Sequence, residues 1–116
     1  MGARTNYKIV HSVNREQDIN VYSHSDGEGS VNTFRNAIRH AMPRLNDDSY
    51  FIRILVNALQ GDHNSEIGYG IYIGEEIVHE EEYDYKEINL LDKTVTIGED
   101  TMPINDFIGL KVKESV

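Results

Sequence analysis

The sequence contains no cysteine, so neither a disulfide framework, nor a thiolate metal site, nor a cysteine nucleophile can form. It also lacks any apolar run close to the roughly 18 residues that a membrane-spanning helix requires. Its first residues do not show the charged-then-apolar pattern of a signal peptide. These absences predict a soluble chain that does not enter a membrane, and they permit a reducing cytoplasm.

Basic residues are scarce in the second half of the chain. Residues 1–60 carry seven basic and six acidic side chains, whereas residues 61–116 carry four basic and fourteen acidic ones, within a net charge of -9. Proteins that bind duplex nucleic acid rely on clustered Lys and Arg against phosphate. Direct duplex binding is therefore disfavoured, although a small anionic ligand held by a few arginines of the first half is not excluded.

The longest apolar run, residues 49–60, predicts the helix around which the chain is built. Residues 46–49 are Asn, Asp, Asp and Ser, whose side-chain oxygens can cap a first helical turn, and Gly61 suits a helix C-terminus. The run indicates about three turns that are apolar over most of their circumference. Arg53, Asn57 and Gln60 interrupt it at spacings of four and three, which places them in one polar stripe.

Alternating apolar residues predict several short strands. Residues 5–10 and 19–23 indicate two strands joined as an antiparallel hairpin. Further strands are expected at 67–74, 86–91 and 94–97, followed by a turn at 98–101 and a small closing turn or helix at 103–108 with Asn105 as its cap.

A second helix is expected to begin with Ser30 as its N-cap and to be limited by Pro43. Its predicted outer face carries Arg35, Arg39 and His40. The two consecutive helices are expected to pack on one face of a mainly antiparallel sheet, which gives a single α+β domain over residues 1–116.

Several segments resemble a group of small proteins encoded mostly by tailed bacteriophages and prophages. They are Met-Gly-Ala-Arg-Thr-Asn at 1–6, Val-Tyr-Ser-His at 21–24, Arg53 within the apolar helix, and Glu-Ile-Gly-Tyr-Gly-Ile at 66–71. The resemblance covers most of residues 1–97, although Ser25 and Asp26 follow the Ser-His pair where the group has an aromatic residue and glycines. It implies a phage accessory protein that counters a host process in the host cytoplasm, and it assigns no catalytic residue.

Arginines one helical turn apart suggest a site for a small anion. Arg35 and Arg39 have this spacing, as do Arg53 and Asn57, so two helices that face a shared groove would present planar donors to a phosphate or carboxylate. Arg53 is the most informative of them, because a charge within an apolar run needs a partner. The competing interpretation pairs it with Asp47, Asp48 or a C-terminal glutamate.

Hydrolytic and metal chemistry have weaker support in the sequence. His24, Ser25 and Asp26 have the residue types of a hydrolase triad, but adjacent residues cannot form one among themselves. His24 is therefore kept as a candidate ligand-binding residue. A metal site is not expected, because His24, His40, His63 and His79 lack zinc-like spacing.

The acidic stretch at 75–85 is the candidate protein-interaction surface, through Glu80, Glu81, Glu82, Tyr83 and Tyr85. Dense negative charge of this kind can mimic a phosphate array for a basic groove. The sequence thus predicts a non-enzymatic protein without cofactor that sequesters a small anionic, nucleotide-like ligand. The alternatives are an acidic inhibitor of a host protein and a small hydrolase, and self-association through strand edges is left open.

Overall fold

The computed structural model describes residues 5–23, 29–60, 69–74 and 85–114. In chain order the elements are β1 (Thr5–Val10), β2 (Ile19–Ser23), α1 (Ser30–Ala41), α2 (Asp48–Gln60), β3 (Tyr69–Ile73), β4 (Lys86–Asn89), β5 (Thr94–Ile97), β6 (Asp100–Pro103) and α3 (Ile104–Glu114). The strands form one sheet in the order β3-β2-β1-β4-β5-β6. β1 and β4 are parallel, and the other described pairs are antiparallel. The predicted α+β class is confirmed.

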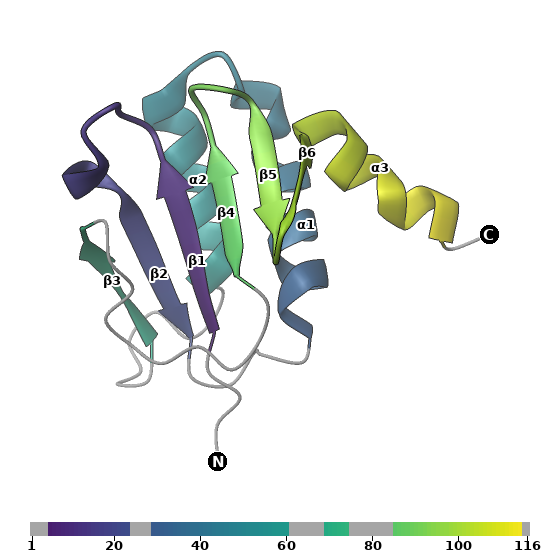
Figure 1. Ribbon diagram of the computed structural model, residues 1–116, viewed down its shortest axis with the longest axis horizontal. Helices are drawn as coiled ribbons and strands as arrows, with labels where there is room; N and C mark the ends of the chain where they lie inside the picture. Colours follow the sequence, from purple (N-terminus) through teal and green to yellow (C-terminus); the bar gives the residue numbers. More distant parts are fainter. Residues whose placement is uncertain (1–4, 24–28, 61–68, 75–84, 115–116) are drawn as a thin grey trace.

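The core lies between the sheet and the helices. α1 and α2 pack against each other, and Figure 1 shows both of them behind the sheet. Because side chains alternate along a strand, Tyr7 and Ile9 of β1 join the helical residues in one buried cluster. The ring of Tyr7 lies 5.4 Å from that of Phe34 in α1. β1 is buried along its whole length, as expected for a central strand.

The hairpin of β1 and β2 is confirmed, with Tyr7 opposite Val21 and Ile9 opposite Ile19. A short 3-10 turn at Arg15–Gln17 joins the two strands. Asn14 caps this turn, because its Oδ1 accepts a hydrogen bond from the backbone N–H of Glu16 at 3.1 Å.

The two helix starts differ from each other. At α2 the capping prediction is confirmed, because Asp47 Oδ1 accepts a hydrogen bond from the backbone N–H of Tyr50 at 3.3 Å. At α1 the prediction of Ser30 as N-cap is wrong. Gly29 occupies the cap position without a side-chain hydrogen bond, while Ser30 is already helical and buried. Gly29 has no side chain that could accept a hydrogen bond from the first turn, so α1 begins without a side-chain cap.

The C-terminal part has more regular structure than the sequence pattern predicted. The turn is confined to Gly98 and Glu99, and β6 follows where only a turn was expected. Pairing with β5 creates this strand, since Thr96 lies opposite Thr101 and their hydroxyl oxygens are 2.9 Å apart. α3 then runs for eleven residues instead of forming a small closing turn, and Asn105 lies inside its first turn.

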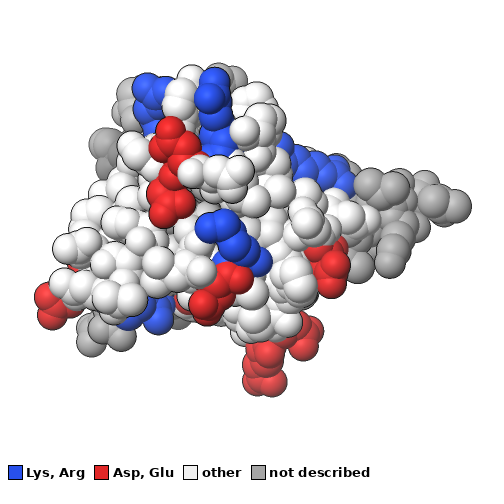
Figure 2. Space-filling model, turned by 90° about the horizontal axis from the view of Figure 1, so that it is seen from above, with Lys and Arg blue, Asp and Glu red and all other residues white. Residues whose placement is uncertain are grey.

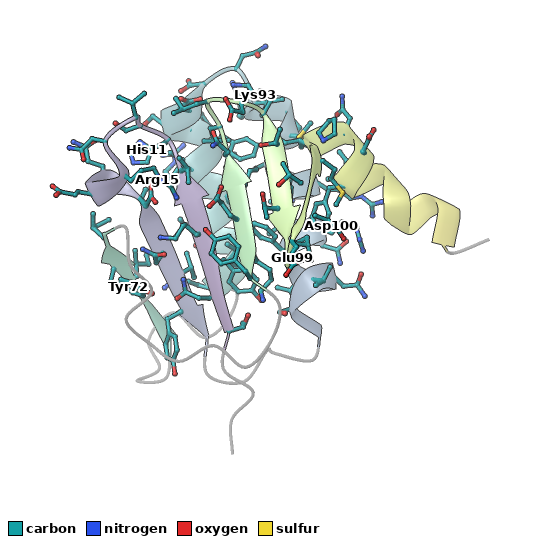
Figure 3. The ribbon with its side chains drawn as sticks, viewed as in Figure 1. His11, Arg15, Tyr72, Lys93, Glu99 and Asp100 are labelled. Atoms are coloured by element: carbon teal, nitrogen blue, oxygen red, sulfur yellow. The ribbon has the colours of Figure 1, made fainter. Side chains whose placement is uncertain are left out.

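The two turns that flank β5 lie at opposite ends of the sheet. Figure 3 shows Lys93 at one end, in the turn after β4, and Glu99 and Asp100 at the other end, where β6 begins. Lys93 and Gly98 both have positive φ, 59° and 62°, which closes the chain tightly at each end.

Candidate functional site

A groove lies between α2 and the edge strand β3. It has a volume of about 550 Å³ and is open to solvent. Five apolar and three polar side chains line it, namely Ile19, Ile54, Val56, Ile71, Ile73, Arg53, Asn57 and Gln60. Small-molecule sites typically have volumes of about 300–1,000 Å³ and mostly apolar walls with a few polar groups, so this groove has the size and lining of a ligand site.

The groove forms because both of its walls carry more apolar surface than the core can bury. Along α2, Phe51, Leu55 and Leu59 are buried at a spacing of four, while Ile54 and Val56 beside them are only partly buried. On β3, Ile71 and Ile73 are 48% and 61% exposed. The two isoleucines share one face of the strand, and that face is the wall opposite α2.

The polar stripe predicted on α2 is confirmed as one lining of this groove. Arg53, Asn57 and Gln60 all contribute to it. The Arg53 guanidinium is exposed and lies 4.4 Å from the centroid of the Tyr50 ring. Within the described part of the chain it forms neither a hydrogen bond nor an ion pair, so the alternative pairing with Asp47 or Asp48 is not found. A guanidinium and two amides beside an aliphatic wall can bind an anion that also carries an apolar or flat part.

Arg35 and Arg39 lie elsewhere and hold α3 against α1. Arg35 is only 5% exposed, although it was predicted on the outer face of its helix. Its Nε donates to the carbonyl of Phe107 at 2.9 Å, and its Cζ lies 4.7 Å from the centroid of the Phe107 ring. Arg39 donates to the carbonyl of Ile108. The predicted outer face is therefore the contact surface of α3, and the structure does not bring these arginines together with Arg53 and Asn57.

A charged cluster occupies the sheet face opposite the helices. Asp18 is fully buried, and its Oδ2 accepts a hydrogen bond from Arg15 Nε at 2.8 Å and lies 3.5 Å from Lys8 Nζ. Arg15 also reaches Glu87, at 3.4 Å. The hydrogen bond to Asp18, with the negative charges of Asp18 and Glu87, raises the pKa of the Arg15 guanidinium above its usual value. Figure 3 shows Arg15 next to His11 at the end of the β1–β2 hairpin.

Tyr85, one of the predicted interaction residues, belongs to this cluster. Its hydroxyl donates to Glu87 Oε1. Burial, followed by the hydrogen bond and the negative charge of Glu87, raises the pKa of Tyr85 above its ordinary value. The phenol therefore remains a donor at neutral pH, and its observed role is to hold Glu87.

A chain of amides extends the cluster toward β3. Asn6 Nδ2 donates to Asn20 Oδ1 at 3.1 Å, and Asn20 Nδ2 donates to the carbonyl of Gly74 at 2.9 Å. The hydroxyl of Tyr72 donates to Asn6 Oδ1 at 3.0 Å. These bonds link three adjacent strands and satisfy buried polar groups, which is a structural function.

Other predicted site residues fall outside the described residues, namely His24, Glu80, Glu81, Glu82 and Tyr83. The structure adds Tyr50, Arg44, Ile71 and Ile73, which the sequence reasoning had not selected. Only the spacing of three between Tyr50 and Arg53 could have indicated the stacked pair.

Within the described segments, no group of three or more His, Cys, Asp or Glu side chains could hold a metal ion. The helices of those segments are all too short or too polar to span a bilayer.

The comparisons with known proteins give no family for this chain. No protein-family model matches it, and neither the curated proteins nor the solved structures contain a match. The function of this chain therefore has to be inferred from the geometry of the groove.

Proposed function

We propose that this protein is a non-enzymatic binding protein that sequesters a small anionic, nucleotide-like ligand in the groove between α2 and β3. The observation that supports this most is the exposed Arg53 guanidinium at the edge of an apolar groove. Such a group can donate two parallel hydrogen bonds to a phosphate or carboxylate. The isoleucines of the opposite wall can contact the flat or apolar part of the same ligand.

The charge distribution favours Arg53 as the anchor for the ligand. Arg15, Arg35 and Arg39 are already engaged by carboxylates or carbonyls, whereas Arg53 contacts only an aromatic ring among the described residues. A cation–π contact uses the face of the guanidinium and leaves its N–H edge available to an incoming anion. Asn57, one turn further along α2, can donate to the same ligand.

The resemblance to small phage proteins supplies a biological setting for this activity. A phage accessory protein that removes a nucleotide signal from the host cytoplasm would counter a host process without catalysis. That setting rests on the resemblance alone, and the binding activity can be tested without it.

The test is isothermal titration of the purified protein with a panel of nucleotides, combined with thermal shift. A ligand that binds only the folded state raises the melting temperature by mass action. We expect Arg53→Met to weaken binding at least about tenfold, because a charge-assisted hydrogen bond is lost while the aliphatic stem is kept. Asn57→Leu should weaken it less.

Arg15→Met is the matched control, since it removes a guanidinium that the structure places on the other face of the sheet. It should leave the affinity unchanged after any loss of stability is taken into account. The proposed function is refuted if no nucleotide binds, or if Arg53→Met and Arg15→Met weaken binding equally.

A further inference from the structure

The ring of Tyr50 carries two guanidinium groups. The Cζ of Arg44 lies 4.3 Å from the ring centroid, and the Cζ of Arg53 lies 4.4 Å from the same centroid. The two positive charges are therefore separated by no more than the sum of these distances. An anion that contacts both groups would gain attraction from each of them.

These two arginines differ from the other arginines that the structure describes. Arg15, Arg35 and Arg39 each donate to a carboxylate or a backbone carbonyl. The side chains of Arg44 and Arg53 form no hydrogen bond or ion pair with any described residue. Both are exposed, so their N–H edges are accessible from solvent.

The backbone fixes Arg44 and Tyr50 in place. Arg44 ends the 3-10 turn at Met42–Arg44, and its carbonyl accepts a hydrogen bond from the N–H of Asp47 at 3.0 Å. Asp47 in turn accepts from the backbone of Tyr50 and Phe51, at 3.3 Å through its side chain and at 2.8 Å through its carbonyl. The Asp47 carboxylate thus caps the helix and forms no ion pair with either arginine.

The same end of the molecule also carries acidic side chains. Figure 2, which looks onto this end, shows groups of basic side chains at one side with acidic ones next to them. Asp48 is exposed, so water and salt screen its repulsion of an anion. Among the described residues, no carboxylate forms an ion pair with either guanidinium.

We propose that Arg44, Tyr50 and Arg53 form a second anion subsite that extends the groove toward the start of α2. The ligand class is therefore one with two linked anionic groups, such as a nucleoside diphosphate, in preference to a monoanion of the same size. Arg53 is shared, because it lines the groove and also stacks on Tyr50. This proposal rests on the proposed function, since it specifies the ligand of the same groove.

The experiment compares AMP with ADP, and orthophosphate with pyrophosphate, by isothermal titration in buffer without magnesium. We expect the unmodified protein to bind ADP about tenfold more tightly than AMP, and pyrophosphate more tightly than orthophosphate. Arg44→Gln should abolish the preference for ADP while the affinity for AMP stays the same. Arg44→Lys should restore only part of it, because an ammonium cannot form the planar bidentate contact.

Two variants of the ring provide a matched pair. Tyr50→Phe keeps the aromatic face on which both guanidiniums stack, so the preference for ADP should persist. Tyr50→Leu removes that face and should reduce the preference as Arg44→Gln does. Circular dichroism of each variant confirms that α2 remains folded.

Each outcome decides between the two proposals. Equal affinities for AMP and ADP, or a loss in Arg44→Gln that is the same for both, would overturn the second subsite and leave the groove function intact. If neither AMP nor ADP binds, and no other nucleotide of the panel does, the proposed function fails. A preference for pyrophosphate that Arg44→Gln abolishes would then still establish the second subsite.

Discussion

At the scale of single residues, the buried charges of the sheet face are the most sensitive positions. Asp18 has no exposed surface, and Lys8 is 2% exposed. Taking charges out of water is costly, and the mutual attraction of the pair offsets that cost only while both partners are present. One oxygen of Asp18, Oδ1, is buried without a hydrogen-bond partner in the described structure, so this carboxylate is held by its other oxygen.

We therefore expect Asp18→Asn to lower the free energy of unfolding by about 2–4 kcal/mol, because it removes the buried negative charge that both Lys8 and Arg15 pair with. Urea unfolding measures this loss. Arg15→Gln is the comparison, and it should cost less, because Arg15 is itself 39% exposed and Asp18 keeps Lys8 at 3.5 Å. Equal losses in the two variants would show that burial does not determine the energy of this cluster.

Residue spacing predicted one part of the site and misplaced another. The spacing of Arg53, Asn57 and Gln60 was sufficient to place them in one stripe, because the stripe depends only on helix geometry. The environment of Arg35 depends on α3, which lies 72 residues away in sequence. The residues near Arg35 in sequence give no sign of that contact. Helix periodicity alone therefore predicted that Arg35 faces solvent.

At the scale of elements, the two edges of the sheet are protected to different degrees. β6 carries Asp100 and Pro103 and leads directly into α3. β3, with the sequence Tyr-Gly-Ile-Tyr-Ile, has no charge and no proline. Charges and prolines on edge strands prevent pairing with other chains. β3 is therefore the edge at which a second strand could add.

We expect the protein to self-associate as its concentration rises, and Ile71→Lys to reduce this association without lowering the melting temperature. Light scattering coupled to size exclusion measures the association. Leu91→Lys is a closely matched control, because Leu91 is 47% exposed and Ile71 48%, but Leu91 lies in a turn. A protein that stays monomeric at all concentrations, or an equal effect of both variants, would contradict the expectation.

The elements with strong apolar periodicity were predicted correctly, and those created by tertiary contacts were not. The two central helices and the first hairpin have clear spacing. β6 has the sequence Asp-Thr-Met-Pro, which has little strand preference and becomes a strand because β5 pairs with it. α3 contains Gly109 and no strong cap, so its length could not be inferred from its own residues.

At the scale of the whole molecule, the sheet consists of two antiparallel halves joined by the parallel pair of β1 and β4. One buried cluster connects the halves, since it includes Tyr7 and Val21 from the first and Ile88 and Val95 from the second. A core shared in this way predicts a single cooperative unfolding transition. α3 takes part in it through Phe107, whose ring lies 6.0 Å from that of Phe34.

Phe107→Ala tests this cooperativity. The side chain is 1% exposed, and its removal should cost about 3–5 kcal/mol, because packing against Phe34 and Arg35 is lost and a cavity remains. The melting temperature should fall by about 10 °C or more in a domain of this size. Far-UV circular dichroism reports the helices, and tyrosine fluorescence reports mainly the half of the sheet made by β1, β2 and β3, which contain Tyr7, Tyr22 and Tyr72, since tryptophan is absent.

The two signals should give the same midpoint, both in the unmodified protein and in the variant. Val13→Ala, at a residue that is 89% exposed, should change that midpoint little. If the circular dichroism of Phe107→Ala showed an early loss of helix while the tyrosine signal kept its original midpoint, α3 would be an independent unit. The shared cluster predicts the opposite, because Phe34 packs against both Phe107 of α3 and Tyr7 of the central strand.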